Sequence, residues 1–170
     1  SRRLPWLHVN LATAFLAAGV VSLFEDLIGK IAVLAVFLPV VAGQGGNAGV
    51  QSLAVILRGL ITREIKPGDA LRLVFIELIV GLANGFIIGV VTALGAWMWK
   101  GNPYLGLVIG VAMVVNMVAA GLAGAVIPIS MKKLGFDPAH SSGIFLTTVT
   151  DVVGFLSFLG FACLFQSRLM

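Results

Sequence analysis

Five apolar segments, each long enough to cross a lipid bilayer, constrain the fold of this 170-residue chain more than any other feature. About 20 apolar residues in a helix cross the hydrocarbon core. The segments are Trp6–Phe24, Ile31–Ile61, Leu71–Trp99, Tyr104–Met131 and Ser142–Phe165. Only 11% of the residues are charged, against about 25% in an average soluble domain. Because backbone groups in lipid must be satisfied within the segment, we predict an all-α integral membrane protein with five transmembrane helices.

The basic residues divide unequally between the two sets of segments that connect these spans. The larger set has eight members, Arg2, Arg3, Arg58, Arg63, Lys66, Arg72, Lys132 and Lys133, and the smaller has three, Lys30, Lys100 and Arg168. Basic loops stay in the cytoplasm, so we predict a multi-pass protein of the cell (plasma or inner) membrane with a cytoplasmic N-terminus and an external C-terminus. The net charge of +4 comes from basic residues whose placement sets the membrane topology, so no nucleic-acid partner is expected.

Asp151 is the one charged residue inside the fifth apolar segment. Ionisable residues at membrane depth are rare and mark ion paths, proton relays or buried pairs. Thr147, Thr148, Asp151 and Gly154 are separated by steps of three and four, which places them on one helix face. We predict that this face binds a cation, with Gly154 leaving room beside the carboxylate. The alternatives are an aspartate that only helps helices to pack, and threonines that bond back to their own helix.

Residues 39–52 of the second apolar segment combine Pro39 and four glycines with amides that include Asn47 and Gln51. Asn47 and Gln51 are four residues apart and share a helix face. At 1.5 Å per residue, Gln51 lies roughly 14 Å and Asp151 roughly 12 Å from the cytoplasmic ends of their spans. We predict that Gly43, Gly46, Asn47 and Gln51 line a water-filled pathway. Close packing of small residues, with the amides joining helices, is the alternative.

Two further carboxylates lie nearer to the predicted cytoplasmic surface. Glu77 either lines a vestibule or reaches toward Arg72 or Lys66. Asp137 precedes Pro138, a pattern typical of a helix N-cap. The available ligands are oxygens, since the sequence has one Cys and no Cys/His set. Oxygen ligands suit a hard cation such as Mg²⁺, which keeps several waters and needs only one or two carboxylates.

The chain resembles the membrane domain of the MgtE family of magnesium channels and transporters. The resemblance rests on residues 39–52 (PVVAGQGGNAGVQS), on Arg58, on Asp137-Pro138-Ala139 and on residues 147–154 (TTVTDVVG). It implies a homodimer in the bilayer, with five helices per chain and a Mg²⁺ pore between the subunits. Asp151 would be the pore carboxylate for hydrated Mg²⁺, the segment from Gly43 to Gln51 would line the pore, and Asp137 would lie at the cytoplasmic mouth, where family members bind regulatory Mg²⁺.

The sequence thus predicts a single membrane domain over residues 1–170, with the cytoplasmic regulatory domains of the family absent from this chain. We predict a magnesium channel that conducts hydrated Mg²⁺ into the cytoplasm. One alternative is a divalent-cation transporter coupled to Na⁺ or H⁺, in which Asp151 binds the driving ion. Another is a membrane scaffold subunit without transport. An enzyme is not expected, because the sequence contains no catalytic triad, metal-ligand cluster or phosphate-binding loop.

Overall fold

The computed structural model describes residues 4–65 and 68–170, and this part of the chain contains helices and no strand. The long helices are α1 (Leu4–Ser22), α3 (Val33–Ile61), α4 (Ala70–Lys100), α5 (Pro103–Lys133) and α6 (Pro138–Leu164). The short helices are α2 (Glu25–Lys30) and α7 (Gln166–Leu169). Among the described residues, five helices are long and apolar enough to cross a membrane. The predicted fold class and the five spans are confirmed, whereas the two short helices were not predicted.

Side-chain caps and one glycine set the ends of the central helices. Asn102 and Asp137 are the N-caps of α5 and α6, and each side chain accepts a hydrogen bond from the backbone N–H two residues on. A proline follows each cap at the first helical position, where the missing N–H is harmless. Gly101 ends α4 in the left-handed conformation, with φ of 72°. The resulting two-residue connection turns α5 back along α4.

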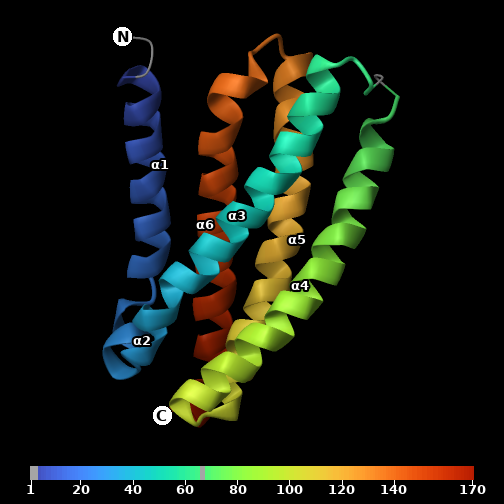
Figure 1. Ribbon diagram of the computed structural model, residues 1–170. Coiled ribbons are helices and arrows are strands. Elements are labelled where there is room, and N and C mark those ends of the chain that lie inside the picture. Colours follow the sequence, from blue (N-terminus) through green and yellow to red (C-terminus); the bar gives the residue numbers. More distant parts are fainter. Residues whose placement is uncertain (1–3, 66–67) are drawn as a thin grey trace.

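Helix α5 is the centre of the bundle, and most of its length is buried. It packs against α3, α4 and α6. Helix α4 packs chiefly on α5, and α1 packs on α6, so these two helices stand at opposite edges (Figure 1). The chain begins and finishes at opposite ends of the bundle, as an odd number of antiparallel spans requires.

The largest buried apolar cluster joins α3, α5 and α6 in the half of the bundle near α2. Leu34, Ile109 and Phe158 in this cluster are completely buried. Leu27 of α2 and the following Ile31 insert into the same cluster. This insertion explains why the turn after α1 folds as a short helix.

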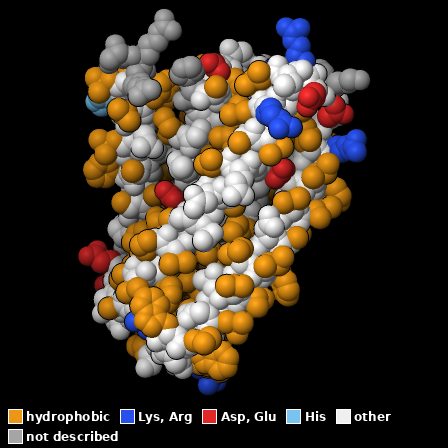
Figure 2. Space-filling model, viewed as in Figure 1, with side chains coloured by type: hydrophobic (Ala, Val, Ile, Leu, Met, Phe, Trp, Pro, Cys, Tyr) orange, Lys and Arg blue, Asp and Glu red, His pale blue; other side chains and the backbone are white. Residues whose placement is uncertain are grey.

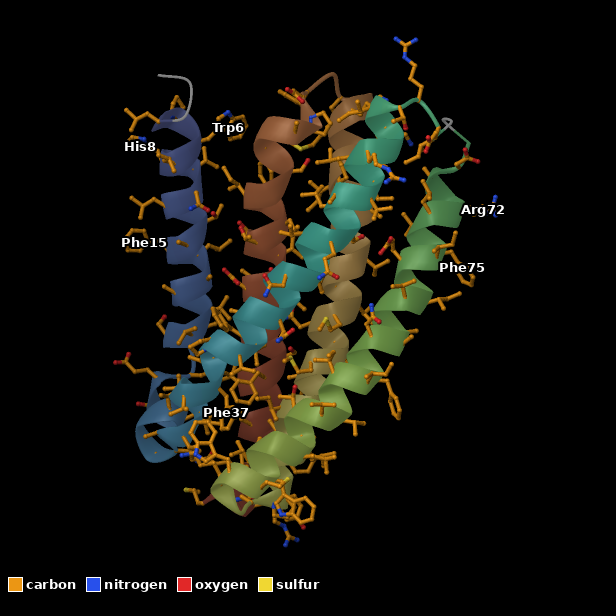
Figure 3. The ribbon with its side chains drawn as sticks, viewed as in Figure 1. Trp6, His8, Phe15, Phe37, Arg72 and Phe75 are labelled. Carbon is orange, nitrogen blue, oxygen red and sulfur yellow. The ribbon has the colours of Figure 1, made fainter. Side chains whose placement is uncertain are left out.

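The outer surface of the bundle is apolar along most of the length of the helices. Phe15 of α1 and Phe75 of α4 are 69% and 61% exposed and point away from the other helices, whereas Phe37 is 4% exposed (Figure 3). Figure 2 shows apolar side chains over most of the visible face. An exposed apolar surface of this extent marks contact with lipid or with another protein.

Basic side chains gather at the two ends of the bundle, more of them at one end (Figure 2). We call the end with the α3–α4 and α5–α6 connections the basic end, and it carries Arg58, Arg63, Arg72, Lys132 and Lys133. The opposite end carries Lys30, Lys100 and Arg168. Arg2, Arg3 and Lys66, which the sequence assigns to the basic end, lie outside the described residues. The orientation inferred from these charges stays a prediction.

Candidate functional site

Helix α3 has one polar face that its own chain leaves uncovered. Gln44, Asn47, Gln51 and Arg58 are all exposed, and their spacing of three, four and seven residues places them on one face. The opposite face is buried against α5 and α6. An amide side chain facing hydrocarbon costs several kcal/mol, roughly 4 or more. In a membrane this face therefore requires water or a second protein surface against it.

Two glycines of α3 leave open space, of which Gly43 is exposed and Gly46 is partly buried at the border of the exposed side. A Cβ atom built on Gly43 or Gly46 meets nothing within 4 Å. The backbone is nevertheless regular, because α3 runs without interruption through Pro39 and the four glycines of residues 39–52. The segment is therefore a continuous helix with a shallow polar surface, and the glycines keep that surface low.

Two glycines of α3 set its level against α6, Gly49 by direct contact and Gly45 through Asn116 of α5. A Cβ on Gly49 would lie 2.7 Å from Leu146 Cδ1, and Gly45 is closed by the Asn116 side chain that also touches Gly154 of α6. Asp151 lies between Leu146 and Gly154 along α6, and Asn47 lies between Gly45 and Gly49 along α3. The two polar side chains are therefore at a similar level of the bundle, whereas the sequence placed Gln51, one turn nearer the basic end, level with Asp151.

Asp151 stands at the edge of this α3–α6 contact and is partly exposed. Its neighbour Thr150 is fully buried. The hydroxyls of Thr147 and Thr148 donate to carbonyls one turn back, Thr148 to Ile144 O at 2.7 Å. Their protons are thus used within the helix, while lone pairs on each oxygen can still accept a hydrogen bond from water.

Gly154 serves a different purpose from the room beside Asp151 that the sequence suggested. It is buried, and a Cβ there would lie 2.6 Å from Asn116 Nδ2 and 3.0 Å from Val41 Cγ1. Asn116 is completely buried and donates from Nδ2 to Val41 O at 2.8 Å. Its Oδ1 finds no hydrogen-bond donor among the described residues. Asn116 is therefore an internal link between α3, α5 and α6 and lies apart from the exposed polar face.

Glu77 and Asp137 are not brought beside Asp151. Glu77 is half-buried on α4, where its backbone carbonyl lies against Gly121 of α5, and α4 packs chiefly on α5. Asp137 lies at the basic end, where its Oδ1 accepts from Ala139 N at 3.0 Å. It also borders a cavity of about 170 Å³ between the ends of α3 and α6. The capping role predicted for Asp137 is confirmed, and its role toward a cation stays a prediction.

One residue of the polar face, Arg58, was absent from the predicted pathway, and Gln44 entered it only as part of the segment from Gly43 to Gln51 that the family resemblance implied. Gln44 and Arg58 are exposed on the same side of α3 as Asn47 and Gln51. The signal was present in the sequence, because residues 44, 47, 51 and 58 follow the helical repeat. Because α3 also carries apolar residues on all its faces, the sequence alone does not tell which face the other helices leave uncovered.

The chemistry of this region suits a hydrated hard cation. Within residues 4–65 and 68–170, no three side chains of His, Cys, Asp and Glu gather closely enough to hold a metal ion directly. What the α3–α6 edge offers is one carboxylate and several amide and hydroxyl oxygens. Such groups accept hydrogen bonds from the waters of an ion that keeps its hydration shell, as Mg²⁺ does.

Comparison with known proteins gives one consistent family. Residues 38–161 match the MgtE family, described as a divalent cation transporter. The magnesium transporter MgtE of Enterococcus faecalis is 41% identical over 166 residues, which are 98% of this chain and 37% of that protein. Those of Bacillus subtilis and Thermus thermophilus are 37% and 35% identical, over 96% and 94% of this chain. The chain spans little more than a third of these relatives. It belongs to the MgtE family of divalent cation transporters.

Proposed function

We propose that this chain forms the ion pathway of a magnesium channel, with Asp151 as the carboxylate that binds hydrated Mg²⁺. The observation that carries the proposal is the polar face of α3, which lies uncovered at the surface of a single chain and level with Asp151. The names of the relatives support magnesium as the cation.

A second copy of the chain supplies the cover that the polar face needs. Two copies related by a two-fold axis place two such faces opposite each other, with water between them. Two Asp151 carboxylates then balance the charge of one divalent ion. Asn47, Gln51, Thr147 and Thr148 accept hydrogen bonds from its waters, and Gly43 and Gly46 keep the passage wide. The homodimer is the pore in this proposal, and neither copy encloses it alone.

The remaining predicted site residues have separate places in the proposal. Asp137 is a second cation-binding carboxylate at the mouth on the basic end, which faces the cytoplasm of the cell. Glu77 belongs to the wall near that mouth. It lies away from Asp151, since α5 separates its helix, α4, from α6. Gly154 has an indirect role, because its missing side chain leaves space for Asn116 on the buried side of α6. Ions move down their electrochemical gradient into the cytoplasm.

Uptake of Mg²⁺ into proteoliposomes tests the role of Asp151. We expect Asp151→Asn and Asp151→Ala to reduce uptake about tenfold or more, in the range seen when groups that support a bound metal are lost. Asp26→Asn is the control, since Asp26 is exposed on the short helix α2. Normal uptake by both Asp151 variants contradicts the proposed ion site.

The same vesicles separate the channel from its alternatives. Uptake driven by a voltage alone, without a Na⁺ or H⁺ gradient, supports a channel. A strict requirement for either gradient supports the coupled transporter, in which Asp151 binds the driving ion. A wild-type protein that carries no Mg²⁺ under any gradient supports a scaffold role.

A further inference from the structure

A cavity of about 450 Å³ opens at the basic end, between the end of α3, the connection to α4 and the end of α5. It is distinct from the polar face of α3. The lining residues are Leu60, Arg63, Ile65, Ala70, Ile129, Lys132 and Lys133. Of these seven described residues, four are apolar and three are cationic, and none carries a carboxylate. The cavity therefore repels a metal cation and favours an anion that has an apolar part.

The wall beside α3 is held in place by its own backbone. The N–H groups of Glu64 and Ile65 both donate to Gly59 O, at 3.0 and 3.2 Å, which folds the connection back over the helix end. Ile65 covers Gly59 so closely that a Cβ there would lie 2.7 Å from Ile65 Cδ1. Arg63 makes this reversal in the left-handed region, with φ of 58°. The cavity is thus a formed feature of the chain.

One of the three cationic side chains of the cavity is held in place by a hydrogen bond. Lys132 Nζ donates to Leu60 O at 2.9 Å, which ties the end of α5 to the end of α3. The other two, Lys133 and Arg63, are exposed. Leu60 and Ile129, each 8% exposed, form the apolar base. The lining thus combines cationic and apolar side chains, and an anionic phospholipid has a group to match each.

We propose that this cavity binds an anionic phospholipid, with its phosphate beside Arg63, Lys132 and Lys133 and an acyl chain along Leu60, Ile65 and Ile129. The cavity lies at the ends of membrane-length helices, where lipid headgroups are found. Basic pockets between membrane helices favour anionic headgroups. A free phosphate ion would contact only the cationic residues of the lining. A phospholipid would contact both the cationic and the apolar residues. The assignment is independent of the ion pathway proposed above.

Lipid binding to the purified chain in detergent tests this site. The probes are phosphatidylglycerol, phosphatidylcholine with the same acyl chains, and inorganic phosphate, with the rise in melting temperature as the readout. The double variant Arg63→Gln/Lys133→Gln removes two charges and keeps the Lys132–Leu60 bond. Its control, Arg58→Gln/Arg72→Gln, removes two exposed charges from the same end of the bundle, outside the cavity.

We expect phosphatidylglycerol to stabilise the wild-type chain more than phosphatidylcholine does, and phosphate to have little effect. The cavity variant should bind phosphatidylglycerol roughly 30-fold more weakly, from about one tenfold step per 1.4 kcal/mol and about 1 kcal/mol per charge. The control should lose much less. Should the double variant unfold, Lys133→Gln alone, at the exposed rim, should weaken binding roughly fivefold.

Three outcomes overturn the assignment. Equal losses in the cavity variant and in the control mean that the basic end attracts lipid only through its overall charge. Equal stabilisation by phosphatidylcholine means that the cations take no part. Stabilisation by inorganic phosphate equal to that by phosphatidylglycerol means that the cavity is an anion site without a place for an acyl chain.

Discussion

Glycine has opposite roles in two regions of this molecule. Along the α4–α5 contact, Gly81, Gly85 and Gly89 of α4 recur every four residues, and a Cβ on any of them would come within about 3.0 Å of α5 backbone atoms. On α3, a Cβ on the exposed Gly43 or on the partly buried Gly46 meets nothing within 4 Å. The first set brings two helices together, and the second set keeps a surface clear.

The difference shows why a glycine-rich membrane segment has no single meaning. Small residues at four-residue spacing are typical of close helix packing in lipid. Helix α3 has such packing too, at Gly45 and Gly49, on the side opposite to its polar face. One helix therefore carries both kinds of glycine, and only the tertiary structure separates them. The following predictions test this separation, from the largest expected effect to the smallest.

The strongest test is Gly89→Ala in the α4–α5 contact. The new methyl group would lie 2.8 Å from Gly110 O, a backbone atom that moves only if α5 moves. We expect a loss of about 1–3 kcal/mol in the free energy of unfolding, as for other overpacked sites. The measurement is circular dichroism during an SDS titration of the protein in detergent micelles.

Gly95→Ala on the same helix is the matched control, because its Cβ meets nothing within 4 Å. This variant should be neutral or slightly more stable, since alanine forms helix better than glycine by about 1 kcal/mol. Equal losses in the two variants would mean that the α4–α5 contact is looser than the structure indicates.

A smaller effect is expected where a side chain, and not backbone, fills the space above a glycine. Gly154→Ala would place a methyl group 2.6 Å from the Asn116 amide. We expect a loss of about 1–2 kcal/mol, and a much smaller additional loss when Asn116 is already alanine. A double-mutant cycle with Asn116→Ala measures this coupling, which should exceed about 0.5 kcal/mol.

Asn116→Ala alone should also be destabilising, because it removes the hydrogen bond to Val41 O and leaves a small cavity. Interhelical hydrogen bonds in membranes contribute on average about 0.6 kcal/mol, so the cavity is the larger part of this loss. Strictly additive effects of Gly154→Ala and Asn116→Ala would show that the two residues do not touch in the folded protein.

The sequence predicted the five spans well, because an apolar run of more than 20 residues in lipid has only the helix to adopt. The predicted segment Ile31–Ile61 and α3 (Val33–Ile61) end at the same residue. The N-caps also follow from local chemistry, as Asp137 before Pro138 shows. Helix α2 was missed because it is short, and tertiary contacts of Leu27 hold it.

Which side of each helix is buried was much harder to predict. In a soluble protein the polar side of a helix marks the solvent, but lipid and protein core are both apolar, and the membrane helices here are apolar on nearly every side. Asn116 and Asn47 therefore look alike in sequence, although one is buried and the other exposed. The approximate depth of Asp151 and of the amides of α3 was predictable, because rise per residue fixes depth whichever way a side chain points. The sequence placed Gln51 level with Asp151, and the structure places Asn47 nearer to that level.

Gly46→Ala gives the smallest effect on stability and the sharpest test of the comparison. Apart from the local helix backbone, no atom of the described residues lies within 4 Å of the new methyl group, so the free energy of unfolding should stay the same or rise by up to about 1 kcal/mol. Mg²⁺ uptake by proteoliposomes should nevertheless fall, roughly twofold to tenfold, because the methyl group narrows the proposed passage. Unchanged uptake together with a loss of stability as large as that of Gly89→Ala would show that a second helix packs tightly there. The polar face of α3 would then be a contact surface, and the ion path would have to run elsewhere.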